Sequence, residues 1–222
     1  MPAEGESMLL KAWIRTTPFY HPVRNWILTL KQGRELRRWE ARGRPVPPPH
    51  IVKQRTIRTL ADRFGLKTLV ETGTYYGDMV EVMKRRFTRI YSIELSKELS
   101  ERAARRFGRD QNVSIIQGDS GSELGKLMSR IDSPTLFYLD GHYSAGITAR
   151  GEKDTPIYEE LAHIFDHDAR HVIVIDDARC FGTDPGYPTL QKLSEFIRSR
   201  RPDAQIEVED DSIRITPAAV GP

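Results

Sequence analysis

The sequence is poor in cysteine and has no long apolar run. Its 222 residues include one cysteine, Cys180, which excludes an internal disulfide and a cysteine-based zinc site. Stability must therefore come from packing, and the composition favours a reducing compartment and a cytoplasmic location. No run reaches the ~18 apolar residues of a membrane-spanning helix, and the first residues, with Glu4 and Glu6, do not resemble a secretion signal.

The net charge of the chain is small, but positive charge is concentrated in one region. The formal net charge is +3, yet residues 24–67 hold twelve Lys and Arg against three acidic residues, which gives +9 there and −6 elsewhere. A basic segment can clamp nucleic-acid phosphates, lie on an anionic membrane surface, or pack against the rest of the chain or a second copy. The three tryptophans of the N-terminal region lie among aliphatic residues, which favours packing, as in a homodimer, or peripheral membrane contact over nucleic acid.

The composition is that of a globular chain with one large domain and an appendage. Hydrophobic residues make up 38% and charged residues 29% of the chain. Residues 44–50, RPVPPPH, contain four prolines, which favour a stiff polyproline II connector. We therefore expect a basic, tryptophan-containing helical extension with its proline-rich linker over 1–50 and a second domain over 51–222.

Strand and helix patterns alternate regularly after the linker. Short apolar segments typical of strands are separated by stripes at helical spacing; these segments span residues 68–71, 89–94, 113–117, 136–140 and 171–176. Such strands predict a parallel sheet buried on both faces, a Rossmann-like doubly wound α/β fold. Residues 206–216 alternate apolar and polar side chains, which predicts a C-terminal antiparallel hairpin and completes a mostly parallel, seven-stranded sheet.

Acidic residues stand where the predicted parallel strands end. They are Glu71, Glu94, Asp119, Asp140 and the pair Asp176 and Asp177. Ligands of open α/β sheets bind beyond the carboxyl ends of the strands. A single carboxylate there can simply cap a helix, but five successive acidic strand ends predict a ligand-binding edge.

The turn after the first strand, ETGTYYGD over residues 71–78, disfavours a dinucleotide. A pyrophosphate-binding fingerprint that starts at Gly73 requires glycine where this chain has Tyr75 and Asp78, and Asp78 would repel a phosphate. A nucleoside without phosphates meets no such repulsion. Glu94 stands where an acidic side chain accepts hydrogen bonds from a ribose diol, and Asp119 can reach an adenine amino group.

The motifs ETGTYYGD, YSIELS, IIQGDS, FYLDGHYS and VIVIDDAR resemble class I S-adenosylmethionine (SAM)-dependent methyltransferases over residues 51–216. The resemblance implies SAM as the cofactor. It also implies a set of cofactor-binding residues: Glu71, Gly73, Thr74, Gly77, Glu94, Asp119, Ser120 and Asp140.

A narrower resemblance links DGHYSAGITARGEKDTPIYEEL and IDDAR to bacterial O-methyltransferases associated with sugars and surface polysaccharides. It implies methylation of a hydroxyl on a small molecule or glycan, with Mg²⁺ bound by Asp140, Asp176 and Asp177. His142 occupies a position where the sugar enzymes often carry an acidic base. His142 and Asp140 are therefore the predicted catalytic residues, although a substrate contact or a plain loop position for His142 stays open.

Other interpretations also remain open. Asp176 and Asp177 could orient the following loop and bind no metal. The basic N-terminal arm could serve an RNA methyltransferase, and the fold could act as a non-catalytic binding module.

Overall fold

The computed structural model describes residues 32–141, 155–184 and 186–218, and it divides into two compact units, Met1–Val52 and Lys53–Pro222. In the first unit, residues 32–41 are helical. The Trp39 indole donates a hydrogen bond of 2.8 Å to the carbonyl oxygen of Pro45, and the Arg44 guanidinium lies 5.5 Å from the Trp39 ring centre. The proline-rich segment therefore folds back onto Trp39. Trp13 and Trp26 lie outside the described residues.

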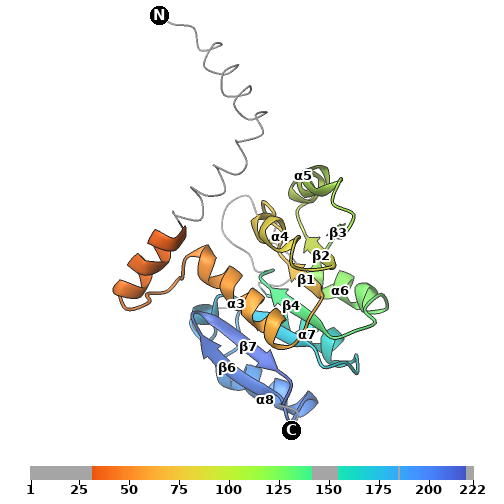
Figure 1. Cartoon of the computed structure of the whole chain (residues 1–222). Helices are drawn as coiled ribbons and strands as arrows, with labels where there is room; N and C mark the ends of the chain where they lie inside the picture. Colours follow the sequence, from red (N-terminus) through yellow and green to blue (C-terminus); the bar gives the residue numbers. More distant parts are fainter. Residues whose placement is uncertain (1–31, 142–154, 185, 219–222) are drawn as a thin grey trace, which may run out of the picture. The chain divides into compact units, whose positions relative to one another are not determined.

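The second unit is built on a single seven-stranded sheet (Figure 1). Its strands are β1 (Thr68–Thr72), β2 (Arg89–Glu94), β3 (Val113–Gln117), β4 (Thr135–Leu139), β5 (Val172–Ile175), β6 (Gln205–Glu209) and β7 (Ser212–Thr216). The strand order is β3-β2-β1-β4-β5-β7-β6, in which β1 to β5 pair in parallel and β7 is antiparallel to both β5 and β6.

Helices cover both faces of this sheet. The described helices are α3 (His50–Arg63), α4 (Asp78–Met83), α5 (Lys97–Phe107), α6 (Ser120–Met128), α7 (Ile157–Phe165) and α8 (Leu190–Arg200), with a 3₁₀ turn over Ala178–Cys180. One core cluster joins the sheet to α6, α7 and α8, and the other joins it to α3, α4 and α5. Consecutive strand residues alternate between the two clusters: Leu69 packs on the α3 side and Val70 on the α6 side.

The structure confirms the predicted doubly wound sheet and its closing hairpin. The apolar runs predicted strands with two buried faces, and β1, β4 and β5 are buried along their whole length. Asp210 and Asp211 form the turn between β6 and β7 with φ angles of 50° and 62°, the left-handed conformation that suits a tight hairpin. In the described part of the chain, no helix is long and apolar enough to cross a membrane.

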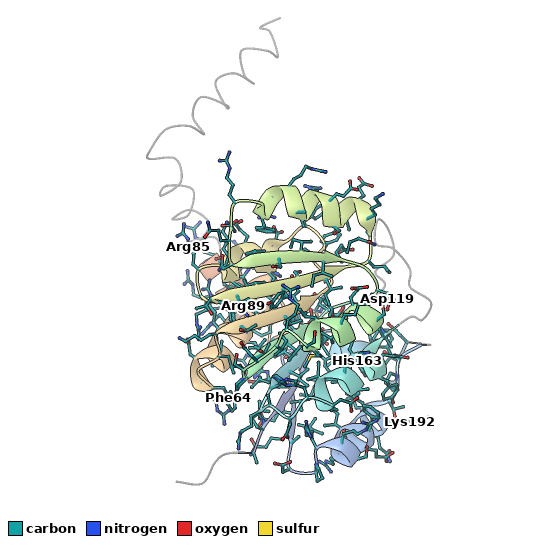
Figure 2. All side chains as sticks on the ribbon, turned by 90° about the vertical axis from the view of Figure 1, so that its right-hand side faces the viewer. Phe64, Arg85, Arg89, Asp119, His163 and Lys192 are labelled. Carbon is teal, nitrogen blue, oxygen red and sulfur yellow. The ribbon has the colours of Figure 1, made fainter. Side chains whose placement is uncertain are left out.

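The parallel strands bring their carboxyl ends to one edge of the sheet. Figure 2 shows Asp119, which follows β3, at the opposite end of the strands from Arg89, which begins β2. Two non-glycine residues at this edge adopt left-handed backbone conformations: Tyr75 after β1, with φ 50°, and Asp177 after β5, with φ 53°. Such conformations cost free energy and cluster at functional sites.

Candidate active site

The turn after β1 passes very close to the end of β4. Gly73 has φ 85°, and a Cβ atom there would lie 2.3 Å from the carbonyl oxygen of Asp140. Gly77 has φ 76°, and a Cβ atom there would lie 2.6 Å from the Phe107 ring on α5. Packing thus requires glycine at both positions that the sequence predicted as cofactor-binding. The spacing of the glycines in the sequence did not reveal this requirement.

Glu94 at the end of β2 is held in a fixed orientation. The backbone amide of Tyr75 donates to Oε2 at 2.8 Å and that of Ser96 donates to Oε1 at 2.9 Å, and the residue is 5% exposed. A carboxylate oxygen has two lone pairs, so each oxygen retains capacity for a further donor. Glu94 is therefore preorganised to accept hydrogen bonds from a diol.

Glu71 at the end of β1 is buried and accepts a hydrogen bond from the Ser92 hydroxyl. The Thr74 hydroxyl lies 2.6 Å from the same Ser92 oxygen. Burial raises the pKa of Glu71 to about 8; the negative charges of Asp140 and Glu94 add to this effect, and the Ser92 hydrogen bond opposes it. At neutral pH Glu71 is mostly protonated and neutral.

The end of β3 is tied to the end of β2. The Gly118 amide donates to the Glu94 carbonyl oxygen at 3.0 Å, and this places Asp119 beside Glu94 at the same edge. Within the described residues, the Asp119 carboxylate has neither a hydrogen-bond donor nor an ion-pair partner, whereas Ser120 begins α6 and is buried. The Asp119 carboxylate is available to a ligand.

Thr72, the last residue of β1, was not predicted as a site residue. Its hydroxyl is buried and has no hydrogen-bond partner among the residues that the structure describes. A Cβ atom on Gly141 would lie 3.0 Å from this hydroxyl oxygen. Because buried hydroxyls are normally hydrogen-bonded, Thr72 marks the junction of β1 and β4 as a place for a polar ligand atom.

Two of the predicted magnesium ligands, Asp176 and Asp177, contact a lysine. The Lys53 ammonium on α3 donates to Oδ2 of the buried Asp176 and lies 3.6 Å from Oδ1 of Asp177. The Tyr138 hydroxyl lies 2.6 Å from Oδ2 of Asp176 and 3.1 Å from Oδ2 of Asp140. Burial and the two aspartates raise the pKa of Tyr138 well above its usual value, so Tyr138 is a hydrogen-bond donor here. We call these five residues the Lys53 cluster.

Asp177 is engaged by a second cation. Its Oδ1 accepts a hydrogen bond of 2.8 Å from Arg179, which also pairs with the buried Asp211. The described residues contain no group of three His, Cys, Asp or Glu side chains arranged to hold a metal ion. The predicted magnesium set therefore fits an ion poorly, because cations of the chain already lie on two of its carboxylates.

His142, the predicted base, lies outside the described residues, so its role stays a prediction. Sequence reasoning missed Lys53 and Tyr138, although a signal for each was present. Lys53 lies four residues before Ile57 and so extends the buried stripe of α3 by one turn. Tyr138, in β4, lies two residues before Asp140, a spacing that places two side chains on the same side of an extended chain.

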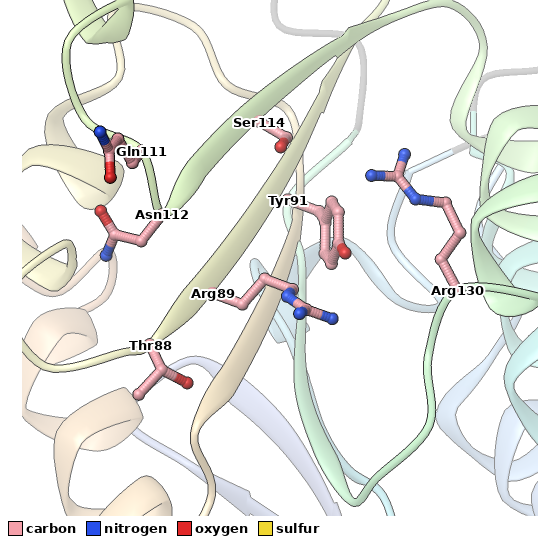
Figure 3. A pocket seen from close by; sticks show the side chains of 7 residues that line it. All are labelled: Thr88, Arg89, Tyr91, Gln111, Asn112, Ser114 and Arg130. Atoms are coloured by element: carbon pink, nitrogen blue, oxygen red, sulfur yellow. The ribbon is translucent and has the colours of Figure 1, made fainter.

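The structure also contains a polar cavity of about 610 Å³ away from this edge, shown in Figure 3. Its lining residues are Thr88, Arg89, Tyr91, Gln111, Asn112, Ser114 and Arg130. The Arg130 guanidinium lies 4.9 Å from the centre of the Tyr91 ring. Because Arg89 and Ser114 stand near the beginning of β2 and β3, the cavity is remote from Glu94 and Asp119, and no predicted site residue lines it.

Solved structures share this fold. The O-methyltransferase TomG from Streptomyces achromogenes, involved in tomaymycin synthesis and crystallised with SAM, is 17% identical with a TM-score of 0.55 over 85% of this chain and 89% of its own. The Podospora anserina methyltransferase PaMTH1, bound to S-adenosylhomocysteine (SAH), is 16% identical with a TM-score of 0.54 over 91% and 98%. The chain thus shares the fold of these two methyltransferases, in agreement with the fold that the sequence motifs predicted.

Sequence comparison reaches less of the chain. Ribosomal RNA small subunit methyltransferase A from Acidobacterium capsulatum is 35% identical over 72 residues, which are 31% of this chain and 25% of that protein. The match spans only about a quarter of the length of this curated relative. No family model matches the chain.

Proposed function

We propose that this protein is a SAM-dependent methyltransferase that methylates a hydroxyl group on a small molecule or glycan. The observation that carries the proposal is the state of Glu94, a buried carboxylate at the end of β2 whose two oxygens are fixed by the amides of Tyr75 and Ser96. Such a carboxylate beside the Gly73 turn suits a ribose diol. The fold shared with SAM-bound and SAH-bound methyltransferases supports the same cofactor.

The nucleoside half of SAM would lie along the ends of β2 and β3. Glu94 accepts hydrogen bonds from the two ribose hydroxyls, and the available Asp119 carboxylate accepts one from the adenine amino group. Ser120, at the first turn of α6, lies beside the adenine. These roles need acceptors in fixed positions, which the Glu94 amide contacts and the Gly118 link provide.

The methionine half would lie over the turn between β1 and α4. Gly73 and Gly77 shape this turn, and Thr74 is oriented by its contact with Ser92. The buried hydroxyl of Thr72 offers a hydrogen bond to a polar ligand atom at the same place. The sulfonium would then lie on the side of Asp140, at the end of β4.

Methyl transfer is an in-line displacement in which the carbon–sulfur bond breaks as a carbon–oxygen bond forms, and SAM becomes SAH. The protein's main task is to align the acceptor oxygen with the methyl carbon. The hydroxyl proton must leave to a base. We propose Asp140 as the residue that orients the acceptor at this edge and His142 as that base.

Calorimetric titration with SAM and SAH tests the proposal most directly. We expect both to bind, and we expect Glu94→Ala to weaken binding at least about tenfold, because a charged hydrogen-bond acceptor is worth roughly 1.5–3 kcal/mol. Glu98→Ala on the exposed first turn of α5 is the matched control and should bind like the wild type. If the folded wild type shows no binding heat with SAM and none with SAH, the proposal is refuted and a non-catalytic module is favoured.

The acceptor can be found with labelled SAM. Incubation of the protein with methyl-labelled donor and fractionated extracts should label a small-molecule or glycan fraction. Label confined to RNA would instead favour the second candidate function.

That second candidate is RNA methylation, favoured by the match to a ribosomal RNA methyltransferase and by the basic segment. The helix over residues 32–41 exposes three arginines at helical spacing, Arg34, Arg37 and Arg38. RNA binding through them would fall steeply with salt and would be lost when all three are replaced by glutamate. Salt-independent or undetectable RNA binding removes this candidate.

A cytoplasmic location, a homodimer and contact with a membrane surface stay predictions. Size-exclusion chromatography with light scattering tests the dimer, and flotation with anionic vesicles tests the membrane contact.

A further inference from the structure

The Lys53 cluster already contains a positive charge, the Lys53 ammonium, in contact with two of the predicted magnesium ligands, Asp176 and Asp177. The Lys53 side chain is 19% exposed and that of Asp176 is 1% exposed, so their contact is shielded from water. Lys53 reaches Asp176 across 123 positions of sequence. Lys53 and Asp176 are far apart in the sequence but are buried together, so their contact is a specific feature of the fold.

The chain already places two donors on one oxygen of Asp176 and one donor on the other. Oδ2 receives the Lys53 ammonium and the Tyr138 hydroxyl, and Oδ1 accepts the Asp177 amide at 2.9 Å. A magnesium ion needs near-octahedral oxygen ligands at about 2.0–2.1 Å. It would have to displace Lys53 from Oδ2 or tolerate an ammonium beside it, and like charges at such short range in a buried site repel strongly.

We propose that Lys53 is the resident cation of this cluster and that the protein therefore works without a divalent metal ion at Asp140, Asp176 and Asp177. Lys53 is a positioning residue: it fixes Asp176, whose Oδ2 lies 2.6 Å from the Tyr138 hydroxyl, and the same hydroxyl lies 3.1 Å from Oδ2 of Asp140. An ammonium can donate hydrogen bonds but cannot bind an acceptor oxygen as a Lewis acid. It supplies charge balance and orientation only.

The first half of the proposal, that Lys53 excludes a metal ion, does not depend on the proposed function. The second half, metal-independent methyl transfer, rests on it. A direct metal-binding measurement therefore separates the two: if the protein fails to bind SAM, the role of Lys53 is still decided by the metal titration alone.

The metal titration uses Mn²⁺ as the probe, with free Mn²⁺ counted by electron paramagnetic resonance. We expect the wild type to bind no stoichiometric Mn²⁺ up to about 1 mM, a limit that covers the usual affinities of protein carboxylate sites. Lys53→Met removes the ammonium and leaves Asp176 without its cation, whereas Asp177 keeps Arg179. We expect this variant to gain one Mn²⁺ site with an affinity at least about tenfold tighter than any binding by the wild type.

Two further variants separate a specific site from general loss of structure. Lys53→Arg keeps a cation and should exclude Mn²⁺ as the wild type does, whereas the double variant Lys53→Met with Asp176→Asn should lose the gained site. Circular dichroism confirms that each variant is folded. One equivalent of Mn²⁺ bound by the wild type and lost in Asp176→Asn would overturn the proposal, and this decision needs no Lys53 variant to fold.

Activity provides an independent measurement once an acceptor is known. Methyl transfer by the wild type should be unchanged within about twofold in excess chelator, since no step requires the ion. A tenfold or larger loss that added Mg²⁺ restores would overturn the proposal while leaving the methyltransferase assignment intact.

Discussion

Glu71 and Ser92 are register partners on β1 and β2, and the Ser92 hydroxyl donates a hydrogen bond to the buried Glu71 carboxyl. Even with this donor, burial raises the pKa of Glu71 from 4.5 to about 8. Removal from water thus outweighs the hydrogen bond, and the folded protein holds a proton that the unfolded chain releases near pH 4.5.

The raised pKa of Glu71 predicts a loss of stability with rising pH. The folded state binds the extra proton between about pH 4.5 and 8, so the stabilisation is complete below pH 4.5 and is lost as the pH rises through 8. Glu71→Gln removes this titration. We expect the melting temperature of the variant to rise relative to that of the wild type as the pH is raised from about 5 to about 9. Scanning calorimetry at each pH measures this difference.

Glu98→Gln on the exposed start of α5 is the control for this comparison and should follow the wild type at every pH. A melting-temperature difference between wild type and Glu71→Gln that stays constant from pH 5 to pH 9 would contradict the assignment of a raised pKa to Glu71.

The raised pKa of Glu71 also predicts that SAM binding releases protons. SAM carries a sulfonium and an ammonium, and a cation placed near Glu71 favours its ionised form and lowers its pKa. Near pH 7.5 the wild type should therefore show binding heats that differ between Tris and phosphate, in proportion to the ionisation enthalpies of the buffers. Glu71→Gln should show equal heats in both. Equal heats for a wild type that binds SAM would show that the donor's cations lie away from Glu71.

The turn at Gly73 passes so close to the Asp140 backbone that adding one methyl group, in Gly73→Ala, should lower the free energy of unfolding substantially. Gly65 and Gly73 both have positive φ angles, 66° and 85°, but a Cβ atom at Gly65 meets nothing within 4 Å, whereas one at Gly73 meets backbone at 2.3 Å. Gly65→Ala should cost about 1–2 kcal/mol of unfolding free energy from backbone strain alone. Gly73→Ala should cost at least about 3 kcal/mol, because overpacking is added.

Chemical denaturation of both glycine variants measures this difference, and SAM titration shows whether the Gly73→Ala turn still binds. Equal costs at the two positions would mean that the turn after β1 moves freely away from Asp140, and the geometry assigned to this edge would be wrong.

The sequence allowed the sheet and its acidic edge to be predicted because both follow from local patterns. Two-sided apolar strands required a parallel sheet, and a parallel sheet places Glu71, Glu94 and Asp119 at one edge whatever the details of packing. The structure bears out the sheet and shows why Glu94 is rigid. The amide of Tyr75 reaches it across 19 positions, which no spacing rule reports.

Contacts between distant segments could not be predicted from local patterns. The magnesium hypothesis counted the carboxylates after β4 and β5 but had no means to place Lys53, which precedes β1, against Asp176. Gly77 shows the same limit: its partner, the Phe107 ring, lies at the end of α5. Local spacing identified residues that matter, and only the fold showed what each one touches.

The buried His171 predicts a loss of stability in acid that is separate from Glu71. The Thr135 amide donates to His171 Nδ1 at 3.1 Å, so Nδ1 is unprotonated and Nε2 carries the hydrogen that faces His167 Nδ1 at 3.0 Å. A second proton has no acceptor in this arrangement. Burial, with the charges of His167 and Arg201, lowers the pKa of His171 from 6.5 to about 4.

Because the folded pKa of His171 is below its unfolded value, its stabilisation is complete above pH 6.5 and is lost as the pH falls toward 4, by up to about 3 kcal/mol. His171→Asn keeps an acceptor near the Nδ1 position for the Thr135 amide but cannot titrate. We expect the variant to be less stable than the wild type at pH 7.5, since it loses the edge contact with Phe137. Its melting temperature should fall less than that of the wild type between about pH 7 and pH 5.

Nuclear magnetic resonance of the imidazole should show no protonation of His171 in the folded wild type above about pH 5. A His171 titration midpoint near 6.5 in the folded protein would mean that the ring reaches water and that the Thr135 hydrogen bond is absent in solution.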